Sequence, residues 1–288
     1  MSVLQMAPEP EVRETIGWGT RFDALTVVAC AVVALFTLAA VFAPIVAPYD
    51  PTQVDASAVY QGPSTAHLLG TDDAGRDILS RLLHGARASL LGPAIVVLVA
   101  AVVGTVVAVS AAWVGGRFDA LVSRTLDVIF AFPGLVLAII AAAVIGPGLL
   151  APVAALSISY VPYIARVLRT AAIRQRNLPY IAALEVQGFG ALAICVRHLV
   201  PNLLPLLIVQ ATVSFGYALL DLSAISFLGL GTQPPAPEWG LMVANGQPSI
   251  IAGHIEQSLY AGLTIVVAVV SFNVLGQGLA KSFLGDDR

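Results

Sequence analysis

Charged residues are scarce in this sequence, and lysine is almost missing from it. Of its 288 residues, 11% are charged and 58% are hydrophobic, and Lys281 is the single lysine. A soluble domain needs more polar surface than this composition supplies. The balance therefore excludes an ordinary soluble globule and indicates a chain whose main solvent is a lipid bilayer.

Several chemical motifs are also missing. The two cysteines, Cys30 and Cys195, show no metal-type spacing, so we expect both to be packing thiols. The four histidines form no H-E-x-x-H motif, and no G-x-S-x-G motif appears, so the sequence shows no catalytic machinery of either kind. No G-x-x-x-x-G-K-[ST] phosphate loop occurs, so any ATP hydrolysis must come from a separate chain.

Long apolar stretches dominate what is present. Crossing about 30 Å of hydrocarbon takes roughly 20 helical residues. The sequence predicts an all-α membrane protein with six transmembrane helices, at approximately 22–47, 88–113, 125–146, 149–168, 199–227 and 257–280. We accordingly expect a tail at 1–21, a first helix at 22–47, an external loop with an interfacial helix at 48–87, a five-helix core at 88–281 and a second tail at 282–288.

The positions of the basic residues predict the orientation, because Lys and Arg collect on the cytoplasmic side. With both termini in the cytoplasm, the inner segments hold all but three of the 14 Lys and Arg residues. Those three, Arg76, Arg81 and Arg87, share an outer segment with three aspartates. The segment at about 170–198 is then the largest cytoplasmic loop.

That loop has an unusual composition. Four arginines lie between Arg166 and Arg176, helix-forming residues follow Pro179, and a Gly-Phe-Gly break occupies 188–190. The pattern predicts two short helices joined at a bend. Their small side chains would let another surface approach closely, which favours a docking element. The alternative is an inner loop that obeys the charge rule and does nothing else.

The end of this loop resembles the cytoplasmic "EAA" loop of ABC importer permeases, in which a glycine precedes an R-H-x-x-P-N ending. In that family the loop forms coupling helices that sit in a cleft of the ATP-hydrolysing subunit. The resemblance thus implies that the ATPase contacts are made by Tyr180, Ala182, Ala183, Glu185, Gly188, Arg197, His198 and Pro201. The chain departs from the pattern where the family has Glu-Ala-Ala: it has Ala182, Ala183 and Leu184, so the usual acidic contact is absent or displaced to Glu185.

Three further stretches, at 67–90, 115–135 and 225–240, resemble the dipeptide, oligopeptide and nickel permease branch of that family. The resemblance implies a subunit of the bacterial inner membrane that forms half of a pathway for peptides. It also implies four kinds of partner: a second homologous permease, two ATPase subunits or one fused ATPase, an external substrate-binding protein, and the lipid bilayer. ATP and Mg would be bound by the ATPase partners, with no cofactor in this chain and no nucleic-acid partner. Nickel or another small solute remains an alternative cargo, and an ion-driven secondary transporter remains an alternative class.

Polar residues inside the predicted helices are candidates for the pathway, because they are costly there. Asp221 is the clearest, although a backbone group or Ser223 could satisfy it instead. The other pathway candidates are Gln210, Ser214 and Asn273, whose commonest use is to hydrogen-bond between helices. We expect Asp127 to pair with Arg124.

Charged residues of the outer segment predict an external gate. Its candidates are Asp72, Asp73, Arg76, Asp77 and Arg81. We expect the aspartates to pair with the arginines and to seal the outer mouth, with direct ligand binding as the alternative. We expect Trp239, in the second outer loop, to anchor at the membrane interface.

Overall fold

The protein is a bundle of long helices, as the sequence predicts. The computed structural model describes residues 23–284, and within that range it has helices and connecting segments but no β-strand. Five helical segments are long and apolar enough to cross a membrane. They contain α1 (Ala24–Val46), α2 (Ile78–Val114), α5 (Leu150–Arg176), α8 (Val200–Phe227) and α11 (Glu256–Leu284). The all-α membrane class is thereby confirmed.

The third predicted span is broken. In place of one helix at 125–146, the chain forms α3 (Gly116–Phe130) and α4 (Gly134–Ile145), which are bent by 71° relative to each other. Pro133 stands at the break and cannot donate a backbone hydrogen bond to the preceding turn. The two helices make a sixth span only if they are counted together.

The second helix begins earlier than predicted. The expected interfacial helix is the first part of α2, so the predicted boundary near residue 88 falls inside one continuous helix. Asp77 caps this helix, because its carboxylate accepts a hydrogen bond from the Ser80 backbone N–H at 2.8 Å. Ile78 and Leu82 do not lie on a membrane surface: both are buried against Trp239 and Met242.

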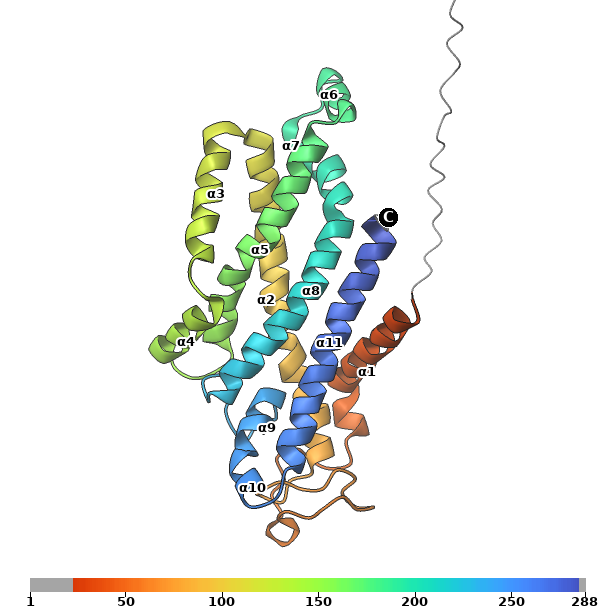
Figure 1. The fold of residues 1–288 in the computed structure, drawn as a ribbon, viewed down its shortest axis with the longest axis vertical. Coiled ribbons are helices and arrows are strands. Elements are labelled where there is room, and N and C mark those ends of the chain that lie inside the picture. Colours follow the sequence, from red (N-terminus) through yellow and green to blue (C-terminus); the bar gives the residue numbers. More distant parts are fainter. Residues whose placement is uncertain (1–22, 285–288) are drawn as a thin grey trace, which may run out of the picture.

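The centre of the bundle is the packing of α2 against α5 and α8 (Figure 1). Gly104 on α2 lets the backbones approach closely, because a Cβ at this position would meet Ile164 of α5 at 3.2 Å. Small residues allow such close approach between membrane helices, where lipid gives apolar side chains little reason to associate. The core therefore lies along α2, and the other helices are arranged around it.

One flank of the bundle is less covered. α1 packs on α2 and α11, yet most of its side chains are exposed. Cys30 is among the exposed ones, so the expectation that it is a packing thiol is wrong, whereas Cys195 is partly buried. Apart from Thr26 and Thr37, α1 is apolar on all sides, so hydropathy does not predict which of its residues turn inward.

The short elements gather at the two ends of the bundle (Figure 1). α6 (Pro179–Val186), α7 (Ala191–Ile194) and the π-helical turn η2 (Cys195–Leu199) lie at one end. The 3₁₀ turn η1 (Ala56–Ala58), α9 (Trp239–Asn245) and α10 (Gln247–Ile251) lie at the other. The predicted cytoplasmic and external loops therefore lie at opposite ends. The sidedness itself, with both termini in the cytoplasm, stays a prediction.

Some predicted features fall outside the described residues. The tail at 1–21 and the last residues of the tail at 282–288 lie there, as do Arg13, Arg21 and Arg288, which contribute to the charge asymmetry.

Candidate coupling and translocation sites

The segment from α6 to α7 is a helical hairpin with a sharp bend. Pro179 begins α6, where its missing N–H costs nothing. Gly188 ends the helix with a positive φ of 81°, and the Gly188 and Phe189 backbone N–H groups donate to Glu185 and Leu184. The bend at 188–190 and the short helix α6 agree with the prediction. The second short helix is not separate, because α7 continues through η2 into α8 as one helical segment, Ala191–Phe227.

Tyr180 fixes this hairpin to both of its neighbouring long helices. Its hydroxyl donates to Gln175 Oε1 of α5 at 3.1 Å and accepts from Asn202 Nδ2 of α8 at 3.0 Å. Ile181, the next residue, is buried. α6 is therefore tied to the end of α5 and to the start of α8.

The remaining surface of the hairpin is open. Val186 on α6 is 89% exposed and Leu192 on α7 is 78% exposed. The predicted contact residues are exposed too, or partly so in the case of Tyr180 and His198: Ala182, Ala183, Glu185, Gly188, Arg197 and Pro201 complete the set. Exposed apolar side chains on a short, anchored hairpin are typical of a docking surface.

Arg197 and His198 lie on the π-helical turn η2, just before the start of α8. Such turns occur as local widenings of a helix. The His198 ring meets the edge of Phe189, with 6.4 Å between ring centroids. This contact brings the bend of the hairpin against the turn that leads into α8.

The arginines upstream of the hairpin form ion pairs with a neighbouring helix. Arg166 donates to Asp127 at 2.7 Å, and Arg169 pairs through two nitrogens with Asp119. These are ties between α5 and α3, so the predicted pairing of Asp127 with Arg124 is wrong. A turn of one helix offers an i,i+3 partner, but the partner chosen comes from a neighbouring helix.

Arg176, at the end of α5, contacts α2. Its Nη1 donates to the Ala112 carbonyl at 2.9 Å, and its guanidinium lies 4.9 Å from the Trp113 ring centroid.

A polar hollow of about 310 Å³ lies between α5 and α8. It gathers three of the four predicted pathway residues, Asp221, Gln210 and Ser214, together with Tyr160, Tyr163, Val213 and Tyr217. Asp221 Oδ2 accepts a hydrogen bond from the Tyr160 hydroxyl at 2.9 Å. The partner of Asp221 is thus a tyrosine of another helix and not Ser223 or a backbone group. The tyrosines had not been predicted.

Asn273, the fourth predicted pathway residue, lies elsewhere. Its Nδ2 donates to the Val269 carbonyl of its own helix, and it packs against Gly216 of α8. It does not line the hollow.

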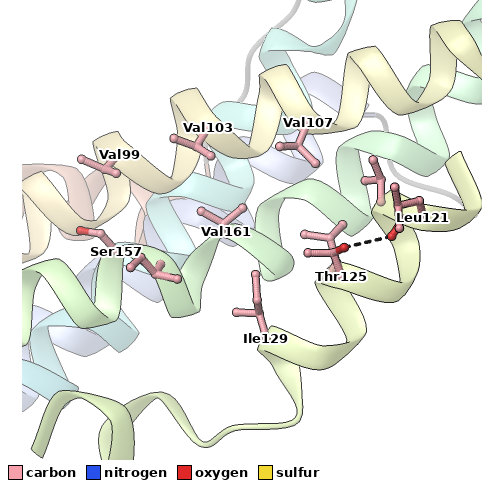
Figure 2. A pocket seen from close by; sticks show the side chains of 11 residues that line it. Val99, Val103, Val107, Leu121, Thr125, Ile129, Ser157 and Val161 are labelled. Carbon is pink, nitrogen blue, oxygen red and sulfur yellow. Dashed lines mark hydrogen bonds between the residues drawn. The ribbon is translucent and has the colours of Figure 1, made fainter. Parts of the chain in front are cut away.

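A second hollow, between α2, α3 and α5, is apolar (Figure 2). Its volume is about 380 Å³, and its lining includes Val99, Val103, Ile129 and Val161. The Thr125 hydroxyl donates to the Leu121 carbonyl of its own helix, so it offers no free donor to a polar ligand. This surface suits an acyl chain and not a charged solute.

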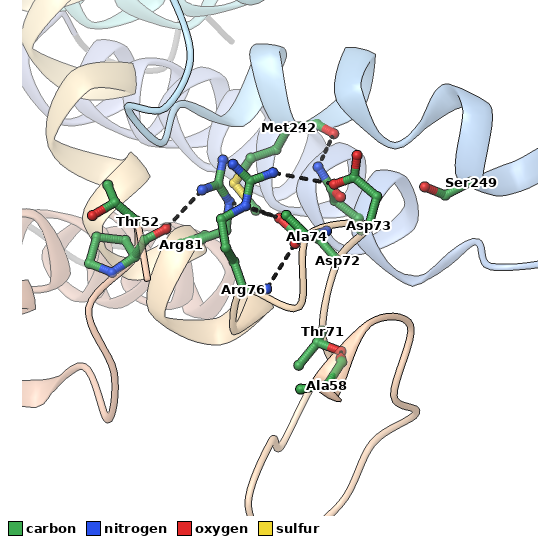
Figure 3. Close-up of polar contacts among 12 residues, drawn as sticks. Thr52, Ala58, Thr71, Asp72, Asp73, Ala74, Arg76, Arg81, Met242 and Ser249 are labelled. Atoms are coloured by element: carbon green, nitrogen blue, oxygen red, sulfur yellow. Dashed lines mark hydrogen bonds and ion pairs between the residues drawn. The ribbon is translucent and has the colours of Figure 1, made fainter. Parts of the chain in front are cut away.

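Four of the five predicted external gate residues come together in one charge cluster, which is largely buried except at Asp73 (Figure 3). Arg76 pairs with Asp72 at 2.7 Å and with Asp73 at 3.3 Å, and Arg81 lies 3.5 Å from Asp72. Arg81 is completely buried and also donates to the Pro51 carbonyl at 2.8 Å. The cluster therefore ties the segment before α2 to the helix itself.

Asp77 departs from the predicted pairing. Its carboxylate lies 3.0 Å from His67 Nδ1, and it caps α2, so its partners are a histidine and a helix N-terminus and not an arginine.

Trp239 is also placed differently from its prediction. It is 1% exposed, and its Nε1 donates to the Leu82 carbonyl of α2 at 2.9 Å. It is a core residue and not an interfacial anchor. Glu238 before it caps α9 by accepting from the Gly240 and Leu241 backbone N–H groups. Burial raises the pKa of the Glu238 carboxyl.

No group of three or more His, Cys, Asp or Glu side chains within residues 23–284 has the arrangement of a metal site.

Comparison with known proteins adds two family matches. Residues 69–284 match the family described as the binding-protein-dependent transport system inner membrane component. Residues 22–63 match the N-terminal transmembrane domain of oligopeptide transport permease C.

Among individual relatives, the chain is 40% identical to the di/tripeptide transport system permease protein DppC of Pseudomonas aeruginosa (strain UCBPP-PA14), over 85% of this chain and 82% of that protein. It is 37% identical to the dipeptide transport system permease protein DppC of Alkalihalophilus pseudofirmus, over 94% of this chain and 91% of that protein. It is 35% identical to the probable D,D-dipeptide transport system permease protein DdpC of Escherichia coli (strain K12), over 91% and 88%.

Proposed function

The chain belongs to the binding-protein-dependent transport system inner membrane components, and on that premise we propose that it forms half of an ATP-driven import pathway for di- or oligopeptides. The family places it as a multi-pass permease subunit of the inner membrane. Two relatives are named as permeases of di/tripeptide and of dipeptide transport systems. These names support peptides as the cargo.

One observation carries the mechanical part of the proposal: α5 and α8 hold the exposed hairpin at one end and line the polar hollow further along. A force on α6 passes through Tyr180 to both helices. Tilting α5 against α8 would widen or narrow the hollow between them. The geometry therefore supports a lever whose input is the hairpin and whose output is the pathway.

In the proposal the ATPase, a partner chain, moves the hairpin. The docking surface consists of the exposed residues of α6, α7 and η2. ATP and Mg²⁺ are bound by the two ATPase subunits, or by one fused ATPase, and this chain itself performs no catalysis. Closure of the ATPase pair moves the hairpin, and opening returns it.

Two further partners complete the assembly. A second homologous permease supplies the other half of the pathway. An external substrate-binding protein delivers the peptide to the end of the bundle that holds η1, α9 and α10 (Figure 1).

The test is uptake of a labelled dipeptide by the complete transporter in proteoliposomes, with and without ATP. We expect uptake that requires ATP and the ATPase subunits and that survives collapse of the ion gradients. Uptake driven by an ion gradient alone would support the secondary-transporter alternative. Uptake of Ni²⁺ in preference to the dipeptide would change the cargo.

Gly188→Arg tests the lever. We expect it to lower ATP-driven uptake by about tenfold or more, because a long charged side chain would stand on the docking surface. Gly188→Asn is the matched control, since asparagine tolerates the positive φ of 81° and adds little bulk. Unchanged uptake by Gly188→Arg would contradict the docking role of the hairpin.

A further inference from the structure

The hollow between α5 and α8 is lined by one carboxylate and three tyrosines. Asp221 is the only charged residue between Val200 and Phe227, so α8 carries a single charge along its whole length. A charge inside a membrane helix is costly and is usually balanced or functional.

The ion pairs of the described residues leave this carboxylate out. Among residues 23–284, no Lys, Arg or His forms an ion pair with Asp221. Its hydrogen bond from Tyr160 satisfies part of one oxygen, but a neutral hydroxyl leaves the negative charge in place. Asp221 is only partly buried, and it opens into the hollow. Within residues 23–284, Asp221 therefore faces the hollow without a cationic side chain paired to it.

The tyrosines give the hollow a second feature that suits a cation. Tyr163 and Tyr217 both line the hollow, and they are 48% and 56% exposed. Tyr160 and Tyr163 lie with their ring centroids 5.6 Å apart. The faces of aromatic rings attract ammonium groups, and they do so more strongly where water is reduced.

The remaining lining suits the rest of a peptide. Gln210 and Ser214 can hydrogen-bond to amide groups, and the volume of about 310 Å³ accommodates the end of a short chain. A peptide amino terminus has an ordinary pKa of about 7.7–8.0, so it is mostly protonated near neutral pH.

We propose that Asp221, with Tyr163 and Tyr217, binds the N-terminal ammonium group of the peptide as it crosses the membrane. This inference rests on the proposed peptide-import function. It makes the permease selective for peptides with a free amino terminus, independently of the external binding protein.

The experiment uses the assembled transporter in nanodiscs, without the binding protein, so that the selectivity of that protein does not enter. The probe is alanyl-p-benzoylphenylalanine, and the comparison is its N-acetylated form. After illumination, cross-linking to this chain is measured by mass spectrometry. We expect the free-amine probe to label the chain about tenfold more than the acetylated probe, the change typical of one charge-assisted contact.

The variants separate charge from structure. Asp221→Asn is expected to lower labelling by the free amine to the level of the acetylated probe, and Asp221→Glu to restore most of it. Tyr217→Leu is expected to lower it and Tyr217→Phe to retain it; because Tyr217 is exposed, this pair serves even if Asp221→Asn fails to assemble. Thr212→Val is the control, since Thr212 lies on α8 outside the hollow and donates to its own helix.

Equal labelling of the wild-type chain by both probes would overturn the inference. So would an assembled Asp221→Asn variant that labels like the wild type. If ATP-driven uptake of a dipeptide by the wild type is also absent, the proposed function fails as well; if that uptake is present, only the ammonium site fails.

Discussion

At the scale of single residues, some glycines lie where a side chain would not fit. Gly240, at the start of α9, lies so near α8 that a Cβ would meet the Ser223 carbonyl oxygen at 2.3 Å. This obstacle is backbone and cannot rotate away. Gly262, in α11, has nothing within 4 Å of the same position. An added methyl group would therefore clash at Gly240 and fit freely at Gly262.

Gly240→Ala is expected to destabilise the protein by about 1–3 kcal/mol, because the added methyl group overpacks a fixed backbone contact. Gly262→Ala is the matched control and is expected to be neutral or to stabilise by up to about 1 kcal/mol through helix propensity. Thermal unfolding of the purified permease in detergent measures both. Equal midpoints for the two variants would show that α9 is not held against α8 in this way.

Single residues also show how far sequence reasoning reached. Asp221 was predicted as a pathway residue, because one charge in an apolar stretch is visible locally. Its Tyr160 partner was not, because the two are 61 positions apart in the chain. Trp239 was assigned to the interface by its residue type, but burial under α2 makes it a core residue.

At the scale of elements, two ion pairs of unequal exposure tie α3 to α5. Asp119 and Arg169 are 21% and 26% exposed, and their contact uses two nitrogens and two oxygens. Asp127 and Arg166 are 68% and 39% exposed and share a single contact of 2.7 Å. Both pairs are of the same type, so exposure and geometry are the main differences between them.

Asp119→Ala is expected to cost about 1–2 kcal/mol of stability, because it leaves the partly buried guanidinium of Arg169 without its bidentate carboxylate partner. Asp127→Ala is expected to cost at most about 1 kcal/mol, since solvent screens an exposed pair. Double-mutant cycles with Arg169→Ala and Arg166→Ala, followed by thermal unfolding, give the two coupling energies. A larger coupling for the exposed pair would contradict the assignment.

The helices themselves were largely predictable, and the exceptions have local causes. Long apolar stretches mark helices, because the backbone in a bilayer must satisfy its own hydrogen bonds. The third span was predicted whole, because average hydropathy does not register Pro133, which divides α3 from α4. The start of α2 was placed too late, because its charged first turns are buried by other elements and not by lipid.

At the scale of the whole molecule, exposed apolar residues lie at both ends of the bundle. Val186 on α6 is 89% exposed and Ile251 on α10 is 92% exposed. With so much of each side chain exposed, an aspartate at either position leaves the packing of this chain intact. The two positions thus compare the ends of the molecule without disturbing its fold.

Val186→Asp is expected to reduce copurification of the ATPase subunits by about tenfold, because it places a charge on the docking surface. Ile251→Asp, at the opposite end, is expected to leave copurification unchanged. The measurement is the amount of ATPase retained by the tagged permease in detergent, without the binding protein. Loss of the ATPase in Ile251→Asp alone would reverse the proposed sidedness.

The sequence by itself determined the helical membrane class, the bend between α6 and α7, and the family. These follow from hydropathy, from glycine and proline chemistry, and from motifs, all of which act over neighbouring residues. Only the tertiary structure decided which arginine meets Asp127, that three tyrosines line the same hollow as Asp221, and that Trp239 is buried. Those contacts join helices distant in the chain, and packing selects them from many partners that are chemically equivalent in the sequence.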